Sequence, residues 1–224
     1  MEQYKKDFME FMVRSKALTF GDFVTKSGRR TPFFINTGNY NTGSRLALLG
    51  RYYAEALRQN LRDDFNVLFG PAYKGIPLAA AASMALSVHY SQDVSFCFNR
   101  KEAKDHGEGG VIVGHKLSAG DRVVIIEDVV TAGTSVRESV PLVKSCAGAS
   151  VVGLVVSVDR MERGLGDKSA LAELREEFGI AAFSIVNLDE IVEYLRDREI
   201  DGVVALDDAT AGRISEYRRE YGCA

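Results

Sequence analysis

The stretch V-V-I-I-E-D-V-V-T-A-G-T-S, from Val123 to Ser135, joins an apolar β-branched run to two adjacent carboxylates and a short segment of small residues. Acidic side chains are rarely buried without partners, so Glu127 and Asp128 at the end of a core strand are expected to serve a ligand. The small residues lead into a helical pattern, and backbone N–H groups at a helix start bind anions. Carboxylates for hydroxyl groups beside amides for a phosphate predict a receptor for a ribose 5-phosphate.

Strand-like and helix-like segments alternate on both sides of this stretch. The expected strands are Val67–Phe69, Val94–Phe98, Arg122–Ile126, Val151–Val158 and Ala182–Val186. The expected helices are Gly43–Asn60, Pro77–Val88, Thr134–Cys146, Leu171–Phe178 and Ile191–Leu195. Continuous apolar strands separated by helices indicate an α/β protein with a parallel sheet that helices cover on both faces.

The 224 residues fit one domain. Helical spacing of the apolar residues Phe8, Phe11 and Met12 predicts an N-terminal helix over Tyr4–Ser15. The segment Leu18–Ile35 has the pattern of a hairpin. We expect residues 1–40 to form a small hood over an α/β core at about 41–200, followed by a helical tail.

Three unusual loops follow strands of the expected sheet: Gly70–Gly75, Asn99–Gly110 and Glu127–Ser135. Ligands of open parallel sheets bind beyond the carboxyl ends of the strands, so we expect these loops to form one site. Competing nucleotide motifs are absent: there is no G-x-x-x-x-G-K-[ST] loop, and G-L-G-D-K-S at Gly164 lacks the third glycine of G-x-G-x-x-G.

Composition excludes several other classes of protein. A net charge of −3 and a pI near 5.7 give no general attraction to nucleic acid or to an anionic membrane, and no run approaches the length of a membrane span. The cysteines and histidines show no metal-ligand spacing and no Cys-x-x-Cys pair (Cys97, Cys146, Cys223, His89, His106, His115). We therefore expect no disulfide framework, no dedicated metal site and a reducing cytoplasm as the setting.

The Val123–Ser135 stretch resembles the diphosphoribosyl-binding motif of type I phosphoribosyltransferases. Four further segments narrow the likeness to the orotate phosphoribosyltransferase family: Lys26–Asn36, Gly70–Gly75, Asn99–Gly110 and Ser157–Gly164. The resemblance runs from Tyr4 to about Tyr217 and is weakest after Asp201. It implies the type I fold, Mg²⁺ as cofactor, and transfer of a phosphoribosyl group from 5-phosphoribosyl 1-diphosphate to N1 of orotate, giving orotidine 5′-phosphate and pyrophosphate.

The segment N-R-K-E-A-K-D-H-G-E-G-G, Asn99–Gly110, is polar, glycine-hinged and nearly neutral. A loop of this kind fits a lid that closes over a charged substrate and excludes water; the plain alternative is a solvated surface loop. Its resemblance to the family's catalytic loop implies closure over the active site of a neighbouring subunit, and hence a homodimer.

The resemblance assigns a role to each matching residue. The diphosphate would be held by Lys26, Tyr73, Lys74 and Arg100, with Lys101, Lys104 and His106 arriving on the lid. Glu127 and Asp128 would hold the ribose hydroxyls, and the following segment would take the 5′-phosphate (Val129, Val130, Thr131, Ala132, Gly133, Thr134, Ser135). The residues expected to carry the chemistry are Lys101, Lys104, His106 and Asp128.

Orotate would contact Phe34, Ile35 and Arg160. An arginine at the carboxyl end of a strand suits a planar carboxylate, because its fork can bind both oxygens; the alternative is a surface arginine paired with a nearby acid. Many relatives carry an aromatic residue where this chain has Ile35. A main-chain contact there would be little changed, whereas a stacking contact would change the affinity for the base.

Two rival functions stay open. A purine phosphoribosyltransferase would share the diphosphoribosyl motif, but Arg160 and the Lys26–Asn36 motif favour orotate. A regulator that keeps the sugar-phosphate pocket and binds RNA would tolerate loss of the lid and would show a basic face. The full set of basic lid residues and the acidic pI speak against it.

Overall fold

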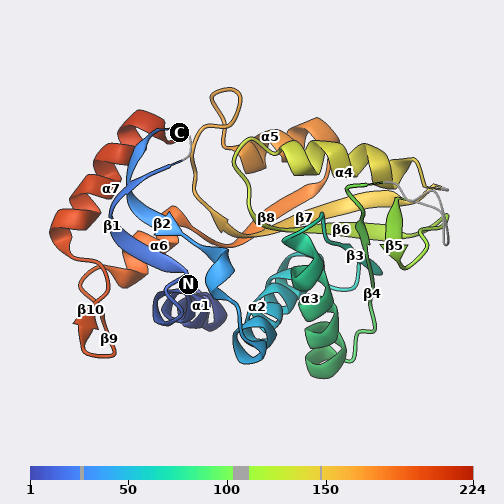
Figure 1. Ribbon diagram of the computed structural model, residues 1–224, viewed down its shortest axis with the longest axis horizontal. Helices are drawn as coiled ribbons and strands as arrows, with labels where there is room; N and C mark the ends of the chain where they lie inside the picture. Colours follow the sequence, from blue (N-terminus) through green and yellow to red (C-terminus); the bar gives the residue numbers. More distant parts are fainter. Residues whose placement is uncertain (26–27, 103–110, 147, 224) are drawn as a thin grey trace.

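The computed structural model describes residues 1–25, 28–102, 111–146 and 148–223. Its centre is a six-stranded sheet of order β5-β4-β3-β6-β7-β8 (Figure 1). Its strands are β3 (Val67–Phe69), β4 (Ser95–Asn99), β5 (Ile112–Gly114), β6 (Arg122–Val129), β7 (Ser150–Asp159) and β8 (Ala181–Asn187). All neighbouring pairs are parallel except β4 and β5, so the carboxyl ends of five strands meet at one edge.

Helices cover both faces of this sheet, as the alternation of side chains along β6 requires. Val124 and Ile126 face a core shared with α2 (Gly43–Leu61) and α3 (Gly75–Tyr90). Val123 and Ile125 face the opposite core, shared with α4 (Thr134–Lys144) and α5 (Ala170–Phe178). Figure 1 shows the two helix layers on either side of the sheet. The expected fold class is confirmed.

A second, two-stranded sheet forms the N-terminal hood. It pairs β1 (Leu18–Val24) with β2 (Arg30–Ile35) in antiparallel register. Around it lie α1 (Gln3–Arg14), α6 (Leu188–Leu195) and α7 (Asp208–Tyr221), with α7 packed along the hairpin (Figure 1). Phe33 of β2 meets Tyr217 of α7 edge to face at 5.9 Å between ring centroids. The C-terminal helix therefore completes the N-terminal hood.

Some elements differ from the expectations. The sheet is not wholly parallel, because β5 returns antiparallel to β4; at Gly114, a Cβ would lie 2.6 Å from the carbonyl oxygen of Phe96. A short hairpin of β9 (Glu199–Ile200) and β10 (Val203–Val204) was not expected, and α4 ends at Lys144. The division into hood, core and tail at about residues 40 and 200 stays a prediction.

Candidate functional site

Glu127 and Asp128 lie at the carboxyl end of β6 and are 7% and 9% exposed. Neighbouring elements hold their backbone. The hydroxyl of the fully buried Tyr53 on α2 donates to the carbonyl oxygen of Glu127 at 2.7 Å, and Ser157 Oγ on β7 donates to that of Asp128 at 2.6 Å. The acidic pair therefore has a fixed position at the edge of the sheet.

The two carboxylates have different surroundings. Burial raises the pKa of Glu127 to about 7; the charge of Asp128 adds to this rise, while the Ser135 hydroxyl and the Lys74 ammonium oppose it. Ser135 donates directly to the Glu127 carboxylate from the first turn of α4. Near neutral pH, Glu127 is thus poised between its protonated and ionised forms.

Asp128 joins three separate parts of the chain. Its Oδ2 accepts hydrogen bonds from Lys74 Nζ at 2.7 Å and from Thr37 Oγ1 at 2.7 Å. Lys74 is the N-cap of α3, and Thr37 begins the short 3-10 helix η1 (Thr37–Asn39) after β2. Thr37 was missed by sequence reasoning, although it directly follows the Lys26–Asn36 motif.

The loop after β6 ends at a helix start that lacks a side-chain cap. Gly133, the N-cap of α4, has φ +73°, and a Cβ there would lie 2.9 Å from Arg137 Nη1 and 3.0 Å from Leu174 Cδ1. Glycine is thus required both by the backbone conformation and by the space. With no capping side chain, the first amides of α4 are available to an anion.

The two ends of the Gly70–Gly75 turn lie in close backbone contact. A Cβ on Gly70 would lie 2.2 Å from the carbonyl oxygen of Gly75. The Ala72–Tyr73 peptide bond is cis, and the Ala72 N–H donates to Asn99 Oδ1 at the end of β4, at 2.8 Å. Tyr73 is 68% exposed at the tip of the turn.

The basic segment after β4 starts beside this turn. Lys101 Nζ lies 5.2 Å from the ring centroid of Tyr73. Arg100 donates its N–H to the carbonyl of Val111 at 2.7 Å, while its buried Nη1 has no hydrogen-bond partner among the described residues. Lys26, Lys104 and His106 lie outside the described residues.

The residues expected to bind a flat base lie on the hood and after β7. Phe34 is 39% exposed and stacks on Phe23 at 5.5 Å, whereas Ile35 packs partly buried against the core. Arg160 follows β7, and its guanidinium lies 4.5 Å from the ring centroid of Phe33. Arg160 does pair with an acid, Glu162, but its side chain is only 11% exposed, so it is not a surface arginine.

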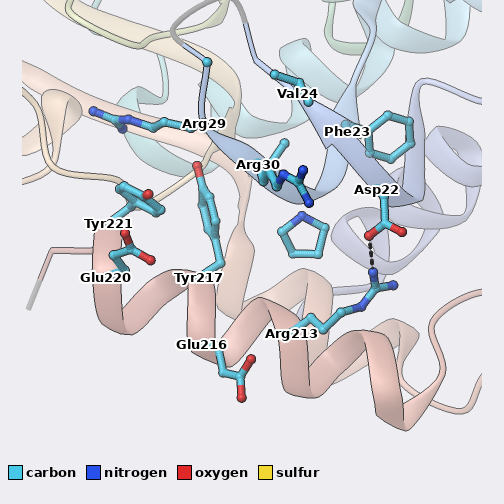
Figure 2. A pocket seen from close by; sticks show the side chains of 13 residues that line it. Asp22, Phe23, Val24, Arg29, Arg30, Arg213, Glu216, Tyr217, Glu220 and Tyr221 are labelled. Atoms are coloured by element: carbon cyan, nitrogen blue, oxygen red, sulfur yellow. Dashed lines mark hydrogen bonds and ion pairs between the residues drawn. The ribbon is translucent and has the colours of Figure 1, made fainter.

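A cavity of about 800 Å³ lies elsewhere, between the hood hairpin and α7 (Figure 2). Asp22, Phe23 and Arg30 line it from the hairpin, and Tyr217 and Tyr221 line it from the helix. None of the expected site residues that the structure describes lines this cavity. The expected site is instead an open edge where several strand ends meet.

Across the described ranges, no three His, Cys, Asp or Glu side chains are grouped as a metal site would need. None of the helices in these ranges has the length and apolar character to cross a membrane. The three cysteines are free.

Comparison with known proteins places this geometry in a family. Residues 36–182 match the model of the phosphoribosyl transferase domain. The chain is 60% identical to the orotate phosphoribosyltransferase of Clostridium acetobutylicum over 99% of both chains, and 57% identical to that of Clostridium botulinum strain Alaska E43, again over 99% of both. A crystal structure of orotate phosphoribosyltransferase from Francisella tularensis superposes with a TM-score of 0.83 at 37% identity, covering 96% of this chain and 99% of the other. The chain therefore belongs to the orotate phosphoribosyltransferase family.

Proposed function

We propose that this protein transfers the 5-phosphoribosyl group of 5-phosphoribosyl 1-diphosphate to N1 of orotate in UMP biosynthesis, and that the strand-end edge described above is its active site. The site assignment is supported by a contact at Asp128: the carboxylate assigned to the sugar and the lysine assigned to the diphosphate, Lys74, meet at 2.7 Å. Family membership supports the reaction, and the geometry supports the choice of residues.

The sugar phosphate would occupy the end of β6 and the start of α4. Glu127 and Asp128 accept hydrogen bonds, as ribose hydroxyls require, and both are held from behind by Tyr53 and Ser157. The uncapped amides of α4 would take the 5′-phosphate, with the favourable end of the helix dipole facing it. The residues assigned to this part are Glu127, Asp128, Val129, Val130, Thr131, Ala132, Gly133, Thr134 and Ser135.

The diphosphate would lie between the Gly70–Gly75 turn and the lid. Lys74 already points at the sugar site, and Tyr73 and Lys101 lie close together beside it. The Nη1 of Arg100, which has no hydrogen-bond partner within the described part of the chain, would supply a further donor. Lys26, Lys104 and His106 belong to the same assignment.

Orotate would lie between the hood and the end of β7. Arg160 suits its carboxylate, and the exposed face of Phe34 and the neighbouring Ile35 suit its ring. Phe34 comes from β2 and Arg160 from the loop after β7, so the base would bridge the two sheets.

In the reaction the C1–O bond to the diphosphate breaks and the C1–N1 bond forms. The proton that N1 loses is balanced by the proton that the departing diphosphate takes up. The sugar passes through a state of oxocarbenium character, as in other glycosyl transfers. Asp128 and an ionised Glu127 would offset the positive charge on the ring. Lys101, Lys104 and His106 would stabilise the departing diphosphate, and Lys104 and His106 are the two candidates for its proton donor.

Mg²⁺ is the expected cofactor. It prefers substrate phosphates, water and one or two carboxylates over an all-protein cage. Glu127 and Asp128 are hard oxygen donors at the substrate edge, and this donor set fits that way of binding. Bound together with the diphosphate, the cation would neutralise negative charge on the leaving group.

We further propose that the protein is a homodimer whose lid reaches the neighbouring active site. The outward face of α3 supports an interface. Met84 and Val88 are 68% and 75% exposed, and with Leu46 of α2 they line an apolar groove of about 360 Å³. A helix that is apolar on all sides normally lies between partners. The cytoplasmic setting stays a prediction.

The direct test is an absorbance assay of orotate consumption with 5-phosphoribosyl 1-diphosphate, run with and without Mg²⁺. Adenine and hypoxanthine serve as competing bases. We expect turnover with orotate and none with adenine or hypoxanthine. Turnover with a purine base would favour the purine phosphoribosyltransferase alternative. Failure with every base, together with salt-sensitive RNA binding, would favour the regulator.

A further inference from the structure

The Glu162 carboxylate is the centre of a small network behind Arg160. Its Oε1 accepts from Arg160 Nε at 2.9 Å, from Arg160 Nη2 at 2.5 Å and from the Tyr217 hydroxyl at 2.8 Å. Its Oε2 lies 4.0 Å from Arg29 Nη1. The Arg160 and Glu162 side chains are 11% and 18% exposed, so this pair is largely shielded from water.

These contacts occupy one edge and one face of the guanidinium. Glu162 binds the side formed by Nε and Nη2, and the Phe33 ring covers a face at 4.5 Å. Both hydrogen bonds to Glu162 use Nε and Nη2 and none uses Nη1, and the Tyr217 hydroxyl also interacts with the Arg160 side chain. Because the guanidinium has donors along more than one edge, the end formed by Nη1 and Nη2 is left to receive a carboxylate in the two-pronged manner.

The network is anchored by the C-terminal helix. Tyr217 rises from α7 towards the hairpin, with its hydroxyl at the far end of the side chain (Figure 2). Burial, followed by the charge of Glu162, raises the pKa of Tyr217, so the hydroxyl keeps its proton and donates. Backbone bonds of 3.0 Å also tie the loop to the end of the chain, from Arg163 N to Tyr221 O and from Cys223 N to Met161 O.

We propose that Glu162, held by Tyr217, is a positioning residue that orients Arg160 so that the free end of its fork meets the carboxylate of orotate. This inference rests on the proposed function, because it takes Arg160 as the ligand of that carboxylate. It makes α7 part of base recognition, although the helix lies beyond residues 36–182, which match the family's common domain.

The test compares Glu162→Gln, Tyr217→Phe and Arg160→Ala by steady-state kinetics with both substrates. Tyr221→Phe is the matched control, since Tyr221 is one helical turn further along α7 and contacts the Tyr217 ring but not Glu162. We expect the KM for orotate to rise about tenfold in Glu162→Gln and about threefold in Tyr217→Phe, as loss of a charged and of a single hydrogen bond implies. In both variants, the KM for 5-phosphoribosyl 1-diphosphate and the kcat should stay within about twofold of wild type. In the Tyr221→Phe control, the KM for orotate should stay within that range as well.

Several outcomes would overturn the proposal. A lower KM for orotate in Glu162→Gln would mean that Glu162 competes with the substrate for Arg160. Equal rises in the KM of both substrates would mean a general structural role. If Glu162→Gln does not fold, as checked by circular dichroism, the single-hydroxyl change Tyr217→Phe still decides.

Arg160→Ala separates this proposal from the proposed function. A rise in orotate KM there, with Glu162→Gln and Tyr217→Phe unchanged, refutes positioning and leaves the role of Arg160 intact. An unchanged orotate KM in Arg160→Ala removes Arg160 from base binding, and the positioning proposal fails with it.

Discussion

The ammonium of Lys74 lies 2.7 Å from the carboxylate of Asp128, and Thr37 from the hood donates to the same oxygen. A cation assigned to the diphosphate is thus paired with an anion assigned to the sugar. The link joins the hood, the Gly70–Gly75 turn and β6.

Replacing Asp128 by Asn should weaken binding of 5-phosphoribosyl 1-diphosphate by about 10- to 100-fold, because a charged acceptor for the sugar hydroxyls is lost. Titration calorimetry measures the affinity, and circular dichroism checks the fold. Asp167→Asn, on an exposed loop, is the control and should bind normally. Unchanged affinity in Asp128→Asn would refute the role of Asp128.

The raised pKa of Glu127 predicts a pH dependence of stability. The folded protein holds the proton up to about pH 7, whereas an unfolded glutamate releases it near its ordinary value of 4.5. Between these values the folded state binds more protons, so stability should fall as pH rises from about 4.5 to 7, by roughly 2–3 kcal/mol.

Urea unfolding of wild type and Glu127→Gln at pH 5 and pH 8 measures this effect. Glutamine cannot ionise, so the substitution should remove the part of the pH dependence of stability that comes from this site. The stability of the variant relative to wild type should therefore be higher at pH 8 than at pH 5. An identical pH dependence in the two proteins would show that Glu127 is not held in its protonated form.

The lid prediction concerns Lys104. Lys104→Ala should lower kcat by about 100-fold, the usual size of a lost proton-transfer or charge-stabilising group, while substrate affinity changes much less. Single-turnover kinetics separates the two effects. Lys116→Ala, an exposed lysine outside the lid, should keep normal turnover. Near wild-type turnover in Lys104→Ala would take this residue out of the chemistry.

Gly70 should tolerate no side chain. A Cβ there would meet the carbonyl oxygen of Gly75 at 2.2 Å, so Gly70→Ala should destabilise the fold by about 1–3 kcal/mol and displace Lys74. Thermal unfolding and titration with 5-phosphoribosyl 1-diphosphate measure the two effects. Gly212→Ala on α7, with nothing within 4 Å of its would-be Cβ, is the control and should be neutral. A neutral Gly70→Ala would show that this turn is pliable.

The sequence alone predicted the layers of the fold and the family. Apolar β-branched runs such as Val123–Ile126 alternate with helical patterns, and this local signal is sufficient to indicate a parallel sheet. The paired acids of β6 and the small residues before α4 lie next to each other in the chain, so the prediction that they form one site needed no coordinates.

Only the tertiary structure decided which distant groups meet. Thr37 reaches Asp128 across 91 positions, and Tyr217 reaches Glu162 across 55, and no local pattern encodes such pairs. β5 was likewise missed, because its antiparallel pairing with β4 depends on the close approach of Gly114 to Phe96 and not on a local pattern. Short-range chemistry follows from the order of residues, whereas the partners of a buried charge depend on how the whole chain packs.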